Sequence, residues 1–206
     1  MIKPILYASR QSSSSVRTLL TAAHLGSDLE LRLVDLTKPA DRGALASVNP
    51  NGKIPVLVEP GFVLWESHAI SEYLCDLSPG QTLLPGQPRP RAEVHRWLYW
   101  ITAPFGNVTG GLNYERFVKR LTGRGEPDPQ AVASHEAGFH QLARVLDAHL
   151  ADHAYLANEA LSVADYSLAA VLLHTETAAY PIGGYAHVLA HRERIRTLPV
   201  WQQVFA

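Results

Sequence analysis

The sequence predicts an α/β domain followed by an all-helical domain. Over residues 1–78, short apolar runs with period two are interspersed with segments of helical period. Residues 79–89 are rich in proline and glycine, which is the composition of a linker. Only helical patterns follow, over residues 90–206. A chain of 206 residues can bury two small cores, so we expect two domains joined at 79–89.

The first domain is predicted to run βαβ, then a weak helix, then ββα, which gives a small mixed sheet with helices on it. Its first helix has apolar residues at i, i+3, i+4 and i+7 from Val16 and ends at Gly26. Two β-rich runs flank Pro60-Gly61, a hairpin signal. The expected elements are, in order, strand 5–7, helix 16–26, strand 29–35, helix 40–48, strands 55–59 and 62–65, and helix 70–77.

The second domain is predicted to contain at least three long helices. The first, over 94–108, keeps one apolar face but contains Pro104. We expect a bend there, because proline inside a helix costs about 3 kcal/mol. A second helix is expected over 139–150. The third, over 163–173, is apolar on almost every side and should be the buried centre of the domain. It opens on a capping box, Ser-Val-Ala-Asp at 162–165.

The composition excludes several classes of function. A net charge of −1 and a pI near 6.8 argue against nucleic acid as a partner. One cysteine, Cys75, allows neither a disulfide framework nor a thiol metal cluster. The pairs His149/His153 and His187/His191 lack a third ligand at motif spacing, so we expect surface or helix-end histidines and no metal. Without a signal peptide or a long apolar stretch, the sequence predicts a soluble cytoplasmic protein with no membrane segment.

The segment 49–74, NPNGKIPVLVEPGFVLWESHAISEYL, carries the strongest functional signal. Pro55 stands at the head of a strand, where it donates no ladder hydrogen bond, so the backbone polar groups of Ile54 can be left free for a ligand. A helix then opens on Glu66-Ser67, and its first N–H groups and dipole favour an anion. The segment therefore predicts a site for a small peptide-like acid.

Three motifs together resemble the cytosolic glutathione transferase superfamily: NPNGKIPVL, ESHAISEYL and LSVADY, in this order and at this spacing. The opening KPILY with its serine cluster is similar to zeta-type members, and the spacing of Lys53, Glu66 and Ser67 also fits theta-like bacterial ones, which indicates a bacterial-type serine class. The resemblance implies a thioredoxin-like first domain, a helical-bundle second domain and a cis Ile54–Pro55 bond. It also implies glutathione as co-substrate and a homodimer, with the helix around 70–77 as a reasonable contact.

The resemblance gives each binding residue a role toward glutathione. Ser67 can present its hydroxyl and amide to the γ-glutamyl carboxylate, and Glu66 can help to hold the adjacent ammonium. The backbone of Ile54, before Pro55, can pair with the cysteinyl backbone as one strand pairs with another. Lys53 could reach the glycine carboxylate. The alternative is that Glu66 and Ser67 only cap a helix and that Lys53 is a solvated turn residue.

A serine after the first strand is expected to activate the glutathione thiol. Lowering a thiol pKa by roughly two units needs about 2.7 kcal/mol, which one hydroxyl donor and the positive end of a helix can supply. Arg17 resembles the arginine in the first turn of the family's first helix, which places the serine at Ser12 by the zeta- and phi-like count or at Ser13 by the theta-like count. Ser12 is favoured; Ser14, Ser15 and Tyr7 are weaker alternatives, and Ser15 is expected to cap the helix.

The second substrate is expected to be a small apolar electrophile. Gln11, Phe105, Val108 and Tyr166 are candidate contacts by position, although core packing explains each of them nearly as well. The leading hypothesis is a glutathione S-transferase. A maleylacetoacetate-type isomerase or a peroxidase using the same serine is the alternative, although SSSSVR stands where zeta-like isomerases carry SSCSWR. A non-catalytic glutathione-binding or scaffold protein is a third possibility, because fold alone does not fix function.

Overall fold

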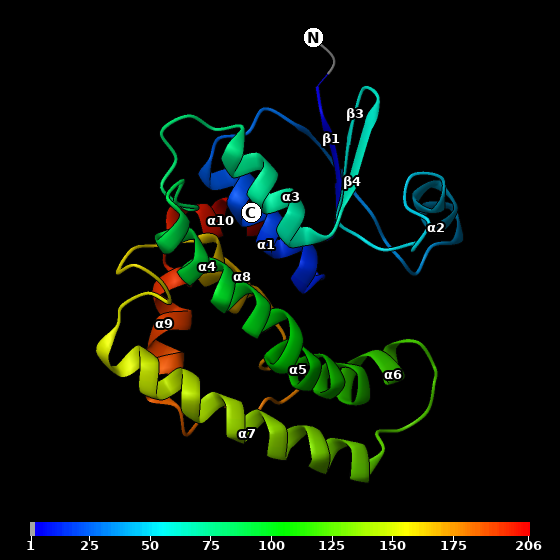
Figure 1. The fold of residues 1–206 in the computed structure, drawn as a ribbon. Coiled ribbons are helices and arrows are strands. Elements are labelled where there is room, and N and C mark those ends of the chain that lie inside the picture. The colour runs from blue at the N-terminus through cyan, green and yellow to red at the C-terminus, as the bar shows by residue number, and fades with distance from the viewer. Residues whose placement is uncertain (1–2) are drawn as a thin grey trace. The chain divides into compact units, whose positions relative to one another are not determined.

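The computed structural model describes residues 3–206, which form two compact units (Figure 1). The first unit comprises residues 3–84 and returns at Leu198–Ala206, and the second is Pro85–Thr197. The α/β unit followed by an all-helical unit confirms the predicted fold class. The division after residue 84 falls inside the expected 79–89 linker. The C-terminal segment differs from the expected 90–206 domain, because its last helix packs in the first unit.

The sheet of the first unit has four strands in the order β2-β1-β3-β4. These strands are β1 (Ile5–Ala8), β2 (Glu30–Leu33), β3 (Val56–Glu59) and β4 (Phe62–Trp65). β1 and β2 are parallel, as a helical crossover requires, with Leu6 opposite Leu31. β3 is antiparallel to both β1 and β4, and the hairpin turns at the predicted Pro60-Gly61.

Four helices complete the first unit: α1 (Ser13–His24), α2 (Pro39–Ala46), α3 (Ser67–Asp76) and α10 (Pro199–Phe205). α1 packs against both α3 and α10, and its buried residues occupy almost every turn. In Figure 1, α2 lies on the other side of the strands from α1 and α3. Leu45 anchors α2 in a small core with Val34, Ile54 and Val56. This arrangement brings the N-terminal turns of α1 and α3 into the same unit as the Ile54–Pro55 bond.

The second unit consists of helices and two π-helical turns. They are α4 (Pro88–Trp100), η1 (Ile101–Phe105), α5 (Gly106–Asn113), η2 (Tyr114–Val118), α6 (Lys119–Leu121), α7 (Pro129–Asp152), α8 (Val163–Val171) and α9 (Ala186–Arg196). The irregularity expected at Pro104 is the wide turn η1. Thr102 Oγ1 donates to the Leu98 carbonyl at 2.7 Å, so that acceptor has a side-chain partner beside the proline. No helix in the described part of the chain has the length and apolarity to cross a membrane.

α8 is buried along its whole length, as its all-round apolar pattern predicts. The capping box is present: Ser162 caps the helix, and Asp165 Oδ2 accepts from the Ser162 N–H at 2.8 Å. His191 on α9 is almost fully buried, and its Nε2 lies 2.8 Å from Asp165 Oδ1. The expectation of a surface or helix-end position is therefore wrong for His191. Spacing within one helix does not say which face a neighbouring helix covers, and here that face meets the carboxylate of Asp165.

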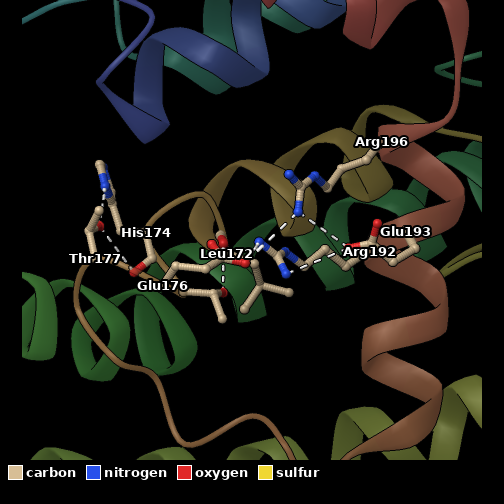
Figure 2. A network of polar contacts seen from close by, with 8 residues as sticks. Leu172, His174, Glu176, Thr177, Arg192, Glu193 and Arg196 are labelled. Atoms are coloured by element: carbon tan, nitrogen blue, oxygen red, sulfur yellow. Dashed lines mark hydrogen bonds and ion pairs between the residues drawn. The ribbon is translucent and has the colours of Figure 1, made fainter.

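Polar contacts fasten the segment after α8 to α9 (Figure 2). Arg192 Nη2 donates to Glu176 Oε1 at 2.5 Å, and Arg196 Nη1 lies 3.9 Å from the same oxygen. The Arg192 side chain is only 8% exposed, whereas that of Glu176 is 65% exposed. Burial raises the pKa of Glu176, but the hydrogen bond and the charges of Arg192 and Arg196 outweigh it, so the net shift is downward. Both contacts join Glu176, in the connection after α8, to arginines of α9.

Candidate functional site

Ser12 is the N-cap of α1. Its Oγ accepts the backbone N–H of Ser15 at 3.3 Å, and its own N–H donates to the Ser9 carbonyl at 3.2 Å. Ser15 is fully buried inside the first turn, and its Oγ has no hydrogen-bond partner among residues 3–206. The expectation that Ser15 caps the helix is therefore wrong, because the cap residue must stand before the first turn. A hydroxyl that accepts through its oxygen still has its proton to donate, so Ser12 can serve as a donor.

Ser13 is the first residue of α1 and is partly exposed. Both serines thus lie at the positive end of a helix of 12 residues, where an anion is favoured. Tyr7 is on β1, and its hydroxyl accepts a hydrogen bond from Arg32 Nη1 at 3.0 Å. The serine candidates therefore lie together at the N-terminus of α1, whereas Tyr7 lies in the sheet and contacts Arg32.

The Ile54–Pro55 peptide bond is cis, as the family resemblance implies. The outermost pairs at this end of β3 are Val56 with Tyr7 on one side and Val56 with Trp65 on the other. Ile54 lies beyond both ladders, so its backbone polar groups take no part in sheet pairing. A strand-like ligand backbone has a place to pair here.

The turn before Ile54 is held by Asn49, a residue that the sequence reasoning did not single out. Its side chain is buried, and Nδ2 donates to the Lys53 carbonyl at 2.7 Å. Its Oδ1 accepts the backbone N–H of Asn51 at 3.0 Å. An asparagine before Pro-Asn-Gly is a turn signal that could have identified this role. The Lys53 side chain is exposed on the turn that Asn49 fixes.

Glu66 and Ser67 form a sharp corner between β4 and α3. Glu66 has a φ of 76°, a region that non-glycine residues seldom occupy, and its side chain is exposed. Such a conformation persists only where the surroundings fix it, and it is frequent at ligand sites. Ser67 is buried, and its carbonyl accepts from Thr18 Oγ1 of α1 at 3.1 Å. The corner thus presents an exposed carboxylate beside the N-terminus of α3.

Arg17 is a buried cation on α1 that contacts the first turn of α3, next to this corner. Its Nη1 lies 2.6 Å from Nε2 of His68, and because a guanidinium only donates, His68 accepts. Burial lowers the pKa of Arg17 to about 10, although the charge of Glu66 acts in the opposite direction. Burial and the charge of Arg17 lower the pKa of His68 to about 3, so His68 is neutral at pH 7. In the sequence, Arg17 serves only as a marker from which the serine is counted, and no local pattern indicates its contact with His68.

The four candidates for the second substrate differ in their exposure. Gln11 is exposed on the serine loop, and its N–H donates to Ser9 Oγ at 3.3 Å. Val108 is partly exposed on α5. Phe105 and Tyr166 are fully buried in the helical unit, and burial raises the pKa of Tyr166. The Phe105 ring lies 5.5 Å from that of Phe139. We therefore assign Phe105 and Tyr166 to core packing in this conformation and retain Gln11 and Val108 as candidates.

No group of three or more His, Cys, Asp or Glu side chains within the described chain is placed to hold a metal ion. The groups described above in the first unit are hydroxyls, helix N-termini and single charges. Those groups in the first unit suit an anionic ligand with a peptide-like backbone.

Comparisons with known proteins match both units. The glutathione S-transferase N-terminal domain matches residues 3–76, and the glutathione S-transferase C-terminal domain matches residues 129–194. Glutathione S-transferase 3 of Zea mays is 35% identical, and the match covers 98% of this chain and 92% of that protein. Together the two domain matches span more than half of the 206 residues.

Solved structures of known proteins resemble this chain over nearly its whole length. Glutathione S-transferase III in its apo form superposes with a TM-score of 0.84 at 32% identity, and 99% of this chain and 96% of that one are covered. A family member from Pseudomonas fluorescens Pf-5, solved with two glutathione bound, has a TM-score of 0.87 at 22% identity over 98% and 92% of the two chains, a likeness that shows the fold. With a thioredoxin-like α/β unit, a helical unit and these relatives, the chain belongs to the glutathione S-transferase family and is a transferase.

Proposed function

We propose that the protein conjugates the sulfur of glutathione to a small apolar electrophile, with Ser12 as the residue that activates the thiol. The observation that carries this proposal is the N-cap geometry of Ser12, whose oxygen accepts from Ser15 and whose proton is left to donate. The relative from Pseudomonas that was solved with glutathione supports the choice of ligand.

Glutathione would bind along three features of the first unit. The γ-glutamyl carboxylate takes the hydroxyl and N–H of Ser67 at the positive end of α3, and its ammonium pairs with the exposed carboxylate of Glu66. The cysteinyl backbone pairs with Ile54 before the cis bond to Pro55. Lys53 is exposed on the adjoining turn and can reach the glycine carboxylate. Each contact matches one chemical group of the tripeptide.

The chemical step begins when the thiol loses its proton to solvent. The Ser12 O–H donates a hydrogen bond to the resulting thiolate, and the N-terminus of α1 adds a favourable dipole. The thiolate then attacks the electrophilic carbon, forming a carbon–sulfur bond and expelling the leaving group with its electron pair. Ser13 is the alternative donor, since it is the first residue of the same helix. Gln11 and Val108 are proposed contacts of the electrophile.

We assign the protein to the serine-type transferases, with the zeta- and theta-like features noted in its sequence. Isomerase or peroxidase activity would use the same thiolate, and Ser14 at the position of the isomerase cysteine argues against the former. We also propose a homodimer. Phe62, Val63 and Trp65 on β4 are exposed by 41–43%, a set of apolar side chains that association would cover.

Turnover of a chloronitrobenzene-type electrophile by wild type, Ser12→Ala and Ser13→Ala tests the proposal. Loss of one aimed donor typically costs about 10²–10³ in kcat, and we expect this for Ser12→Ala with little change in KM for glutathione. Ser13→Ala, which retains the Ser12 hydroxyl and the helix, is the matched control. The thiolate absorbance of bound glutathione should titrate at higher pH in Ser12→Ala. If both variants match wild type, Ser12 is not the activating residue. Good turnover of maleylacetoacetate analogues with poor turnover of aryl halides would instead identify an isomerase.

A further inference from the structure

Asn51 and Gly52 form the only Asn–Gly pair in the sequence, and they lie on the turn before the cis Ile54–Pro55 bond. Both residues are exposed. Glycine has no Cβ, so its backbone nitrogen is the least shielded one that can follow an asparagine. That nitrogen can attack the side-chain amide of the asparagine before it, and an Asn–Gly pair is therefore prone to lose this amide. The other asparagines of the chain are followed by Pro, Val, Tyr or Glu.

Asn49 holds both of the groups that would react. Its Oδ1 accepts from the Asn51 N–H at 3.0 Å and from Asn51 Nδ2 at 3.1 Å, and its carbonyl accepts from the Gly52 N–H at 2.9 Å. Its Nδ2 donates to the Lys53 carbonyl at 2.7 Å, which closes the other side of the turn. The Gly52 nitrogen and the Asn51 amide are thus each bound to Asn49 and not to one another. A reaction between them requires the turn to open, and the hydrogen bonds of Asn49 set how often it does.

We propose that Asn51 is a site of deamidation whose rate is set by Asn49. In the opened turn the Gly52 nitrogen gives its proton to solvent and forms a bond to Cγ of Asn51, and Nδ2 leaves as ammonia, which gives a cyclic imide. Water then adds to one of the two imide carbonyls, and the bond from that carbonyl to the imide nitrogen breaks. The product is an aspartyl residue, or the isoaspartyl isomer in which the main chain runs through the side-chain carbon. In total, water is consumed, ammonia is released and the turn gains one negative charge.

The new carboxylate weakens the turn that is proposed to hold the glycine end of glutathione. It cannot donate to Asn49 Oδ1 as the Asn51 amide does, so the turn loses a hydrogen bond. Its charge also repels the glycine carboxylate and competes with it for Lys53, two residues further along the chain. The isoaspartyl form adds a carbon to the main chain and displaces the turn further. This effect on glutathione rests on the proposed function, whereas the modification itself does not.

Peptide mass spectrometry of protein incubated at mildly alkaline pH measures the loss of the Asn51 amide, and an isoaspartyl methyltransferase assay identifies the isomer. In wild type we expect conversion at Asn51 while Asn158, which is also exposed, keeps its amide. Asn49→Ala removes three hydrogen bonds of the turn and should convert roughly tenfold faster, the factor that about 1.4 kcal/mol of lost turn stability gives. Asn49→Asp, which keeps the acceptor for Asn51, should fall between the two. Asn51→Gln, whose longer side chain must close a larger ring, should keep its amide.

Asn51→Asp supplies the aspartyl product directly. Its KM for glutathione should rise about two- to fivefold, the size of an exposed charge interaction, with kcat little changed. The proposal is overturned if wild type keeps the Asn51 amide as fully as that of Asn158, or if neither Asn49 variant converts faster than wild type. Conversion as expected with an unchanged KM in Asn51→Asp would instead contradict the contact between Lys53 and glutathione, because the modification is measured by mass and not by turnover.

Discussion

Arg17 Nη1 lies 2.6 Å from His68 Nε2, and this contact joins α1 to the first turn of α3. The next residue of α1, Thr18, donates to the carbonyl of Ser67 at 3.1 Å. Two consecutive residues of one helix thus fix two consecutive residues of the other. The helix that begins after Ser12, the serine proposed to activate the thiol, therefore also positions the corner proposed to hold the γ-glutamyl group.

Replacing Arg17 by Met should weaken glutathione binding more than it slows the chemical step. The variant removes the Arg17 donor from the half-buried His68 ring, and losing such a hydrogen bond costs about 1–3 kcal/mol. We expect the KM for glutathione to rise about tenfold, as a loss of 1.4 kcal/mol implies, while kcat changes little. Steady-state kinetics with varied glutathione measure both constants.

His68→Gln is the matched control for Arg17→Met, because its amide oxygen can accept the same hydrogen bond. We expect His68→Gln to stay near the wild-type KM and His68→Leu to behave like Arg17→Met. A folded Arg17→Met with an unchanged KM for glutathione would show that the contact does not position Ser67.

The pKa of His68 also predicts acid sensitivity. It is about 3 in the folded protein and 6.5 ordinarily, so between these values the unfolded chain binds a proton that the folded chain does not. The free energy of unfolding should therefore fall as the pH drops from 6.5 toward 3, by at most about 1.4 kcal/mol per pH unit from this group. Above pH 7 the group adds no pH dependence.

Urea unfolding at several pH values between 7 and 4.5 measures this effect in wild type and in His68→Gln. The variant should lose less stability on acidification. His24 and His149 also have lowered pKa values and remain in both proteins, so the difference between the two curves isolates His68. Parallel curves would contradict the assignment.

The sequence determines the order of elements well, because apolar period and turn residues are local properties. The Pro55 strand, the hairpin at Pro60-Gly61 and the Ser162 capping box all follow from short patterns. Local patterns do not indicate which faces of the helices and the sheet pack against one another. The burial of His191 and the return of α10 to α1 depend on contacts between residues distant in the chain.

The residues of the candidate site also fall into two groups: those that a local pattern indicates and those that only the folded chain brings together. Ser12, Ile54 and Ser67 could be named from motifs, since each stands at a helix start or before a strand. Arg17 and His68 are 51 positions apart, and no local pattern links them. Asn49 combines both situations. Its turn can be predicted from the neighbouring residues, but the burial of its side chain cannot.

Two glycines of α5 should respond to alanine with opposite signs. A Cβ on Gly106 would lie 2.8 Å from the Ile101 carbonyl oxygen, a backbone atom of η1, whereas a Cβ on Gly110 would meet nothing within 4 Å. Gly106→Ala should destabilise by about 1–3 kcal/mol, as overpacking does. Gly110→Ala should stabilise by up to about 1 kcal/mol, because alanine favours the helix. Urea midpoints measure both, and a gain in both variants would contradict the close approach at η1.

Asp165→Asn should destabilise the helical unit far more than its similar shape suggests. Oδ1 accepts from the Leu156 N–H at 2.9 Å and contacts His191 Nε2 at 2.8 Å, while Oδ2 accepts from the N–H and the hydroxyl of Ser162, both at 2.8 Å. An asparagine must direct its NH₂ toward one of these two sides, and each side contains a backbone N–H that cannot reverse its role. We expect a loss of about 3 kcal/mol or more in urea unfolding, as for a broken buried charge contact.

Variants of Ser162 and His191 separate the stability that comes from the helix cap of α8 from the stability that comes from the contact between Asp165 and His191. Ser162→Ala should cost about 1 kcal/mol, the usual value of a lost N-cap. His191→Gln keeps a donor toward Oδ1 and should cost less than His191→Leu, which removes it. If the carboxylate accepts from all its neighbours at once, Asp165→Asn and His191→Leu will be non-additive in a double-mutant cycle, because the two share one oxygen. An Asp165→Asn protein as stable as wild type would mean that the cluster contributes only its shape to the core.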